Sequence, residues 1–137
     1  MIEALDSAIL RELKKDSRQT NVQIAKKLKI SEGTVRQRIS KLIESDIIQN
    51  FTVQTSMKTG FSSFVLVQTN PQIETKKIVQ NLKKIKDIQT IFETTGDYDV
   101  VIKVSTGSAQ EFNFIIEKIR TTKGIQKTDT LVLLKIN

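Results

Sequence analysis

The chain has 137 residues, which is enough for one ordinary domain or for two small ones. Its 22 basic and 15 acidic side chains give a formal charge of +7, which favours an anionic partner. Cysteine and histidine are both absent, which excludes disulfides, thiol nucleophiles and sulfur-based zinc sites and removes the commonest general base. No segment resembles a signal peptide or reaches the ~18 apolar residues of a membrane span. We therefore expect a cytoplasmic protein with no membrane partner, no metal, no cofactor and no enzymatic activity.

The first third of the chain has helical periodicity. Apolar residues recur every four positions from Leu5 to Leu13 and predict a first helix with Asp6 as its N-cap. A second, short helix is expected over 21–28 and a third over 31–45. Only the segment "KIS" separates these two helices, and two short helices joined by so tight a turn form a helix-turn-helix pattern.

After Ile47 the periodicity changes from helical to mixed. We expect an extended segment over 47–55, a linker around Gly60, strands over 64–69, 88–94, 99–105 and 130–136, and helices over 74–86 and 109–121. This β-α-β-β-α-β order predicts a ferredoxin-like antiparallel sheet with both helices on one face. The uncovered face is also apolar, which favours a homodimer through the sheets. The expected α+β organisation is a helix-turn-helix domain over 1–50, a linking strand or linker over 51–62, and a ferredoxin-like domain over 63–137.

The third predicted helix carries a polar and basic stripe away from its apolar side. Between Arg18 and Lys41 the sequence holds seven basic residues and one acid, so most of the excess charge lies on the helix-turn-helix. Such a stripe suits base edges and phosphates in the major groove of double-stranded DNA, whereas the alternative is an ordinary solvated face. The candidate DNA-binding residues are Ser31 (also the expected N-cap), Gly33, which would let the backbone approach the duplex, Thr34, Arg36, Gln37, Arg38 and Lys41.

The stretch "TTGDYDVV" holds the only tyrosine of the chain between two carboxylates. Two acids without further oxygen ligands make a poor cation site, and a catalytic pair would lack a neighbouring base or nucleophile. Two interpretations stay open and are compatible: a hairpin turn, and a pocket for an amino-acid effector. In such a pocket a carboxylate would accept from the ammonium group, and backbone N–H groups would hold the carboxylate of the ligand. The candidate effector-binding residues are Gly96, Asp97, Tyr98 and Asp99.

Three segments together resemble the Lrp/AsnC family of feast/famine regulators: "LDSAILRELKKDSR", "IAKKLKISEGTVRQRISKLIESDII" and "TGDYDVVIKV". The resemblance implies a winged-helix-type DNA reader followed by a domain for dimerisation and effector response. It also implies homodimers that assemble as far as octamers, with an amino acid bound between dimers near "GDYD". Arg38 matches the arginine usual in the recognition helix, and residues 96–99 match the loop motif. Asp46 stands where the family usually has glycine, so the end of the third helix is expected to differ.

Three functions remain to be separated. The first, which we favour, is a sequence-specific transcriptional regulator modulated by an amino acid. The second is an architectural DNA-binding protein that needs no effector, which a weak specificity ratio would support. The third is an enzyme on a ferredoxin-like scaffold, which the missing histidine and cysteine disfavour.

Overall fold

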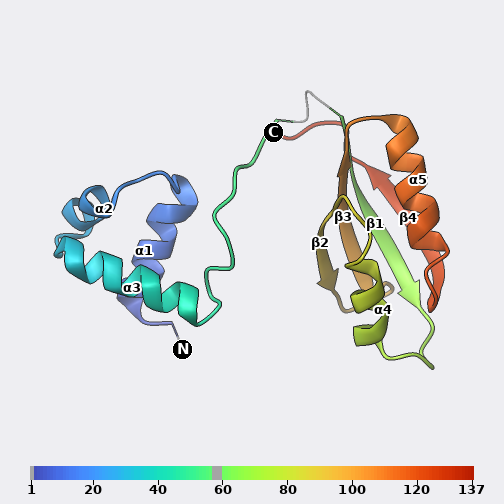
Figure 1. The fold of residues 1–137 in the computed structure, drawn as a ribbon, viewed down its shortest axis with the longest axis horizontal. Helices are drawn as coiled ribbons and strands as arrows, with labels where there is room; N and C mark the ends of the chain where they lie inside the picture. The colour runs from blue at the N-terminus through green and yellow to red at the C-terminus, as the bar shows by residue number, and fades with distance from the viewer. Residues whose placement is uncertain (1, 57–59) are drawn as a thin grey trace. The chain divides into compact units, whose positions relative to one another are not determined.

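The structure is a computed structural model that describes residues 2–56 and 60–137. The chain divides into two compact units, Met1–Gln54 and Thr55–Asn137, which Figure 1 shows as a helical part and a sheet-containing part. Residues 57–59 of the expected linking segment lie outside the described residues. Each unit has its own hydrophobic core.

The helical unit consists of three short helices around a small core. They are α1 (Ala4–Lys15), α2 (Asn21–Leu28) and α3 (Glu32–Glu44). The core consists of Ile9, Ile24, Ala25 and Val35, each at most 5 % exposed. These side chains come from all three helices, so the core holds the pair α2–α3 against α1. The predicted helix-turn-helix is confirmed.

Local capping signals explain where α2 and α3 begin and why the turn between them is tight. Thr20 and Gln23 form a reciprocal capping box at the start of α2. Lys29 then adopts a left-handed conformation with φ of 56°, and the Ile30 N–H donates to the Ala25 carbonyl at 3.1 Å. Ser31 caps α3, because its hydroxyl accepts from the Thr34 N–H at 3.1 Å.

One expectation for this unit is wrong. Glu3, not Asp6, precedes α1, and it makes no side-chain capping bond. Asp6 lies within the first turn, where a carboxylate is still favourable for the helix dipole. The segment expected to be extended over 47–55 begins with bends at 47 and 48, and residues 49–56 lie in neither a helix nor a strand.

The end of α3 follows a regular pattern with an unusual residue. The Asp46 N–H donates to the Ile43 carbonyl at 3.0 Å, and the Ile47 N–H donates to the Leu42 carbonyl at 3.0 Å. This is the Schellman arrangement, in which one residue must adopt a left-handed conformation. Asp46 does so with φ of 59°. Aspartate tolerates this region better than most residues, which explains how the helix ends without glycine.

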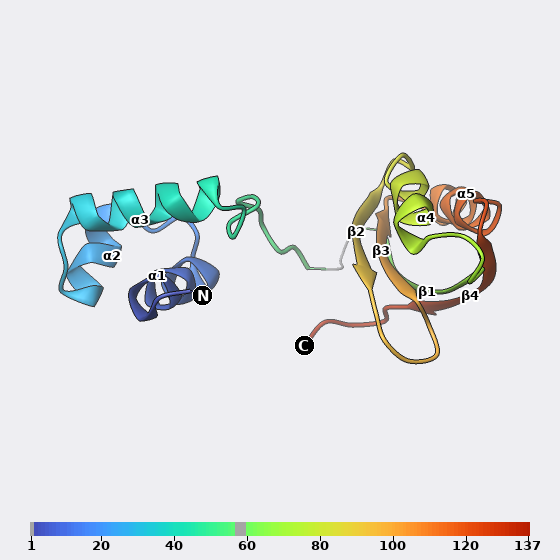
Figure 2. The ribbon, with the colours of Figure 1, turned by 90° about the horizontal axis from the view of Figure 1, so that it is seen from below.

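The second unit is an antiparallel four-stranded sheet with both helices on one side, as Figure 2 shows. The strand order is β2-β3-β1-β4, and every neighbouring pair is antiparallel. The elements are β1 (Phe61–Thr69), α4 (Thr75–Leu82), β2 (Ile88–Glu93), β3 (Val100–Thr106), α5 (Ala109–Arg120) and β4 (Ile125–Val132). The predicted ferredoxin-like topology is therefore confirmed.

Three elements differ from the prediction by three residues or more, and the first is β1, which begins at Phe61 rather than at 64. Helix α4 ends at Leu82 rather than at 86, and β4 spans Ile125–Val132 rather than 130–136. The apolar run near the C-terminus suggested the later strand. Pairing with β1 sets the real position, because Thr69 lies opposite Ile125 and Ser63 opposite Val132. The first half of β4 is polar because it is an edge strand, which hid it from a search for apolar alternation.

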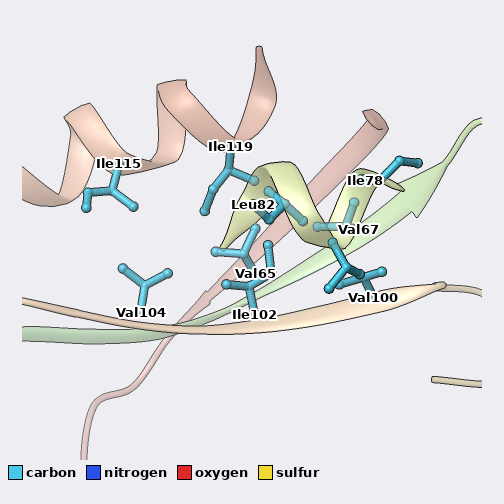
Figure 3. Close-up of a cluster of buried hydrophobic side chains, with 10 residues drawn as sticks. Val65, Val67, Ile78, Leu82, Val100, Ile102, Val104, Ile115 and Ile119 are labelled. Atoms are coloured by element: carbon cyan, nitrogen blue, oxygen red, sulfur yellow. The ribbon is translucent and has the colours of Figure 1, made fainter. Parts of the chain in front are cut away.

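The core of the second unit is larger than that of the first. Alternate residues of β1 and β3 point toward the helices, and α4 and α5 cover them (Figure 3). The ten buried members are Val65, Val67, Ile78, Val79, Leu82, Val100, Ile102, Val104, Ile115 and Ile119. This side of the sheet is fully packed.

The opposite side of the sheet has no cover within the described residues of this unit. Because residues paired across neighbouring strands share a face, five apolar side chains lie together there: Phe64, Leu66, Phe92, Val101 and Leu131. Phe92 is 46 % exposed and Leu131 is 54 % exposed. The predicted second apolar face is therefore present.

Candidate nucleic-acid interface and the Tyr98 loop

The exposed side of α3 presents three of the predicted DNA-binding side chains to solvent. Arg36, Gln37 and Lys41 are all exposed. Arg36 also lies 3.5 Å from Glu32 one turn earlier, but its side chain stays 68 % exposed, so this contact is weak and replaceable. Guanidinium and amide groups can contact base edges, and an ammonium group can contact phosphate. These three residues form the accessible part of the predicted stripe.

The first turn of α3 combines a satisfied cap with an open backbone. The hydroxyls of Ser31 and Thr34 lie 2.7 Å apart and bond to each other. Gly33 follows the cap within the helix, and a Cβ atom added there would meet only the Ser31 hydroxyl, at 4.0 Å. Nothing inside the protein therefore requires glycine at this position. The open backbone fits the prediction that another molecule approaches it closely.

Arg38 differs from the rest of the predicted stripe, because its guanidinium is bound within the protein. It donates to the Glu3 carboxylate at 2.5 Å and lies 3.4 Å from the Asp6 carboxylate. Its side chain is 27 % exposed, whereas that of Asp6 is 15 % exposed. The bond to Glu3 is the main cause that raises the pKa of Arg38. In this structure Arg38 connects α3 to the start of α1, so base contact would require the guanidinium to leave two carboxylates.

A second charged cluster uses another of the predicted basic residues. Lys27 contacts Glu12 at 3.1 Å and the Gln19 side chain at 2.6 Å, while Lys15 contacts Glu12 at 2.9 Å. The two lysine bonds lower the pKa of Glu12 to about 2. Glu12 is only 9 % exposed, so this cluster joins α1 to α2 beside the small core. Part of the basic charge of this unit thus stabilises the fold.

The loop between β2 and β3 contains the four predicted effector residues. Both carboxylates lie before β3 rather than within it, and they have different surroundings. Asp99 accepts from the backbone N–H of Thr69 at 2.7 Å and from its hydroxyl at 3.0 Å. These bonds attach the loop to the end of β1. Of the two carboxylates, only that of Asp99 turns toward β1.

Tyr98 and its neighbours are also held in place. The Tyr98 hydroxyl donates to the Asp129 carboxylate on β4, and this bond is the main cause that raises the pKa of the phenol. The Gln68 side chain donates to the Asp97 carbonyl at 2.8 Å. Within the described residues the Asp97 carboxylate is exposed and has no hydrogen bond or ion pair. The loop is therefore anchored by Tyr98 and Asp99 and presents Asp97 outward.

Gly96 gives this loop its shape. Its φ of 103° lies in the left-handed region that favours glycine, and a Cβ atom there would meet nothing within 4 Å. A shallow depression of about 320 Å³ lies elsewhere in this unit, lined by Arg120, Ile125 and neighbours on β4, without any of the loop residues.

Sequence reasoning missed the partners that position these sites. They are Glu3 and Asp6 for Arg38, and Thr69, Gln68 and Asp129 for the loop. No signal in the sequence pointed to Asp129, because the predicted strand began after it. Over residues 2–56 and 60–137 we find no cluster of three acids suited to a metal. No helix in those ranges is long and apolar enough to span a membrane.

Comparison with known proteins agrees with the division into two units. Residues 2–49 match the model for winged helix-turn-helix DNA-binding domains, and residues 62–136 match that for the Lrp/AsnC ligand binding domain. Together the two matches cover both units. The chain belongs to the Lrp/AsnC family, and it is a transcriptional regulator with a helix-turn-helix DNA-binding domain.

Individual relatives span almost the whole chain. The HTH-type transcriptional regulator LysM of Sulfurisphaera tokodaii is 37% identical over 98% of this chain and 96% of its own length. The structure of E. coli AsnC is 26% identical, with a TM-score of 0.73, and covers 99% of this chain and 94% of its own. A feast or famine regulatory protein from M. tuberculosis, complexed with L-methionine, has the same fold, with a TM-score of 0.81 and 21% identity over 99% of this chain and 94% of its own.

Proposed function

We propose that this regulator binds DNA sequence-specifically as a homo-oligomer and responds to a small amino acid at the Tyr98 loop. The observation that carries the proposal is the division of roles within that loop. Tyr98 and Asp99 are fixed by hydrogen bonds to β4 and β1, whereas the Asp97 carboxylate is exposed beside Gly96. A rigid frame around one unused carboxylate suits recognition of a small cation-bearing ligand.

DNA reading is assigned to the exposed side of α3. Gln37 and Arg36 would contact base edges, Lys41 would contact phosphate, and the backbone at Gly33 would lie close to the duplex. The hydroxyl groups of Ser31 and Thr34, beside the N-terminus of α3, would donate hydrogen bonds to phosphate oxygens of the DNA backbone. A symmetric dimer would read two half-sites about one helical turn, ~34 Å, apart.

The homodimer is assigned to the open face of the sheet. The five apolar side chains on that face would be removed from water by an identical face of a second copy. Further association of dimers, as far as octamers, would bring Tyr98 loops from different dimers together. That arrangement would complete a pocket that a single chain does not enclose.

The effector assignment follows from the chemistry of the loop. An amino acid carries an ammonium group, which can donate to the Asp97 carboxylate, and a carboxylate, which backbone N–H groups near Gly96 can hold. A structure of a similarly folded protein contains L-methionine, which supports an amino acid as the class of ligand. We propose no enzymatic activity, no metal and no other cofactor, and we place the protein in the cytoplasm.

The experiment is a thermal-shift screen of the full chain against the twenty amino acids, with sedimentation in parallel. A ligand that binds only the folded protein adds RT ln(1 + [L]/Kd) to its stability, about 2.7 kcal/mol at a hundred times Kd. We expect one or a few amino acids to raise the melting temperature and to change the assembly state. Asp97→Asn should abolish that response while the dimer persists.

The matched control is Glu93→Gln, which neutralises an exposed carboxylate at the end of β2 and should leave the response unchanged. Silence across all twenty amino acids would overturn the effector role. It would favour an architectural DNA-binding protein that needs no effector.

The dimer is tested with two phenylalanines of similar exposure. Phe92 is 46 % exposed on the open face, and Phe114 is 62 % exposed on α5. Phe92→Asp should convert dimers to monomers in sedimentation, because a charge would be buried in the interface. Phe114→Asp should leave the dimer intact. Equal behaviour of the two variants would contradict an interface on the open face.

A further inference from the structure

The outer side of α4 is a basic surface that DNA reading by α3 does not use. Lys76, Lys77, Lys83 and Lys84 are all exposed, and Lys86 follows in the next turn; together they form the lysine surface of α4. Lys76 and Lys77 lie within α4, away from the buried side chains Ile78, Val79 and Leu82, and Lys83 and Lys84 follow in the turn after the last helical residue. The amides of Gln80 and Asn81 lie on the same outer side.

This surface contrasts with Lys15, Lys27 and Arg38 of the helical unit, because none of its charges is compensated by a nearby carboxylate. None of the five lysines forms an ion pair with a carboxylate in the described chain, and the only polar contact is from Lys84 to the Asn81 amide at 3.3 Å. Between residues 74 and 87 the sequence offers two carboxylates, Glu74 and Asp87, one at each end. Like charges so close together along the chain repel one another, and an anionic partner would relieve that repulsion.

The composition of the surface indicates which kind of anion fits. Ammonium and side-chain amide groups are donors that suit phosphate oxygens spaced along a backbone. The segment from Glu74 to Asp87 contains no aromatic residue, so it lacks the stacking groups typical of single-strand binding. Donors without stacking groups fit the outside of a duplex better than unpaired bases.

We propose that the lysine surface of α4 binds the phosphate backbone of duplex DNA that flanks the site read by α3. The inference rests on DNA binding by the helical unit. Once α3 is bound, the covalent connection holds the second unit near flanking duplex at a high effective concentration, so weak phosphate contacts add to overall affinity. These contacts carry no sequence information and lengthen the bound segment of DNA.

The test compares the salt dependence of binding on two lengths of duplex. A preferred site is first selected from a randomised pool with the full chain and then placed in duplexes of about 20 and about 60 base pairs. The variant is the triple change Lys76→Gln, Lys83→Gln and Lys84→Gln. On the long duplex we expect the slope of log K against log salt to become shallower by about 0.9 for each phosphate that a lysine no longer neutralises, or roughly 2–3 per bound protomer.

Two controls keep charge and folding apart from direct binding. Replacing Lys118, Lys123 and Lys135 by glutamine removes the same net charge from the same unit and should leave the slope much closer to that of the native protein. Replacing the three α4 lysines by arginine keeps the charge and should restore the slope. On the short duplex the α4 variant should bind like the native protein.

The possible results separate this inference from the DNA-reading role. Two results would overturn the proposal that the lysine surface of α4 binds phosphate. One is an equal salt slope for the native protein and the α4 variant on the long duplex. The other is an equally shallow slope for the α4 variant and the control variant. If selection returns no preferred site, sequence-specific reading by α3 fails instead. The same slopes measured on mixed-sequence duplexes of both lengths would then still decide whether α4 contacts phosphate.

Discussion

Two groups of basic residues, one in each unit of this chain, differ in whether they form ion pairs. In the helical unit, Lys15, Lys27 and Arg38 hold carboxylates that connect one helix to another. In the sheet unit, the lysines on the outer side of α4 contact no carboxylate within the described residues. The unit assigned to DNA reading by its sequence therefore uses part of its charge for its own stability. The net charge of the protein indicates that a partner is anionic. The ion pairs within the protein determine which basic side chains are available to contact that partner.

The cores of the two units differ as well, and the difference has a physical reason. The helical unit buries five apolar side chains, whereas the sheet unit buries ten. A unit with so small a core retains little stability after loss of one large side chain. Ion pairs such as that of Lys27 and Glu12 connect helices that the core alone holds weakly.

The largest expected effect comes from truncating one core isoleucine in each unit. Ile24→Ala and Ile102→Ala should each cost about 2–5 kcal/mol of unfolding free energy, because both side chains are fully buried. The consequences should differ, since the helical unit has less stability to lose. Ile24→Ala should abolish DNA binding while sedimentation still shows native assembly. Ile102→Ala should weaken assembly first.

The chain provides a selective probe for that comparison. Tyr98 is the single tyrosine and there is no tryptophan, so tyrosine fluorescence reports on the sheet unit alone. Circular dichroism of the helices reports on both units. Two separate transitions in the Ile24→Ala protein would support independent units, whereas coincident transitions by both probes would contradict them.

The second effect concerns Arg38, where the sequence and the structure indicate different roles. Arg38→Ala should weaken specific DNA binding roughly tenfold or more. The informative variant is Glu3→Gln with Asp6→Asn, which leaves the arginine but removes its partners. We expect this double variant to lose affinity in the same direction, because α3 would no longer be connected to α1. Binding as tight as native or tighter would show that Arg38 reads a base and that the carboxylates compete for it.

Much of the architecture was accessible from sequence because its signals are local. The cap at Ser31, the capping box of Thr20 and Gln23, and the alternation along β1 and β3 all lie within a few residues. The pairings that position the sites are not local. Arg38 lies 35 positions from Glu3, and Tyr98 lies 31 positions from Asp129. Spacing along the chain cannot reveal such contacts. The sequence therefore predicted that all side chains of the polar stripe on α3 are equally available to DNA, whereas Arg38 is bound to two carboxylates.

The third effect is a different sensitivity of the two units to pH. Glu12 has a pKa of about 2 in the folded protein, below its ordinary value of 4.5. Its stabilisation is therefore complete above about pH 4.5 and is lost as the pH falls toward 2. Tyr98 has a raised pKa because its hydroxyl donates to Asp129, so its stabilisation is present below pH 10 and is lost as the pH rises further.

We therefore expect acid to weaken the helical unit and alkali to weaken the sheet unit. Glu12→Gln should flatten the acid side of a stability–pH curve followed by circular dichroism. Tyr98→Phe should flatten the alkaline side without changing the acid side. If the stability of Glu12→Gln still falls at acid pH as in the native protein, other carboxylates of the helical unit dominate its acid sensitivity.

The smallest effect is also the one in which stability and function should move in opposite directions. Gly33 lies in the first turn of α3 with helical geometry, and a Cβ atom there would clash with nothing in the protein. Gly33→Ala should therefore stabilise the helical unit by about 0.5–1 kcal/mol, because alanine loses less backbone entropy in a helix. If the backbone at this position lies against the duplex, the same methyl group should weaken DNA binding.

Gly107→Ala provides a control outside the helical unit and should leave DNA binding unchanged. This glycine also has room for a Cβ atom, which would lie 3.4 Å from the nearest atom, a Glu111 carboxylate oxygen. If Gly33→Ala makes the protein more stable and leaves its affinity for DNA unchanged, the proposed close approach of DNA to the backbone at Gly33 is contradicted. DNA recognition would then rest on the side chains of Arg36, Gln37 and Lys41.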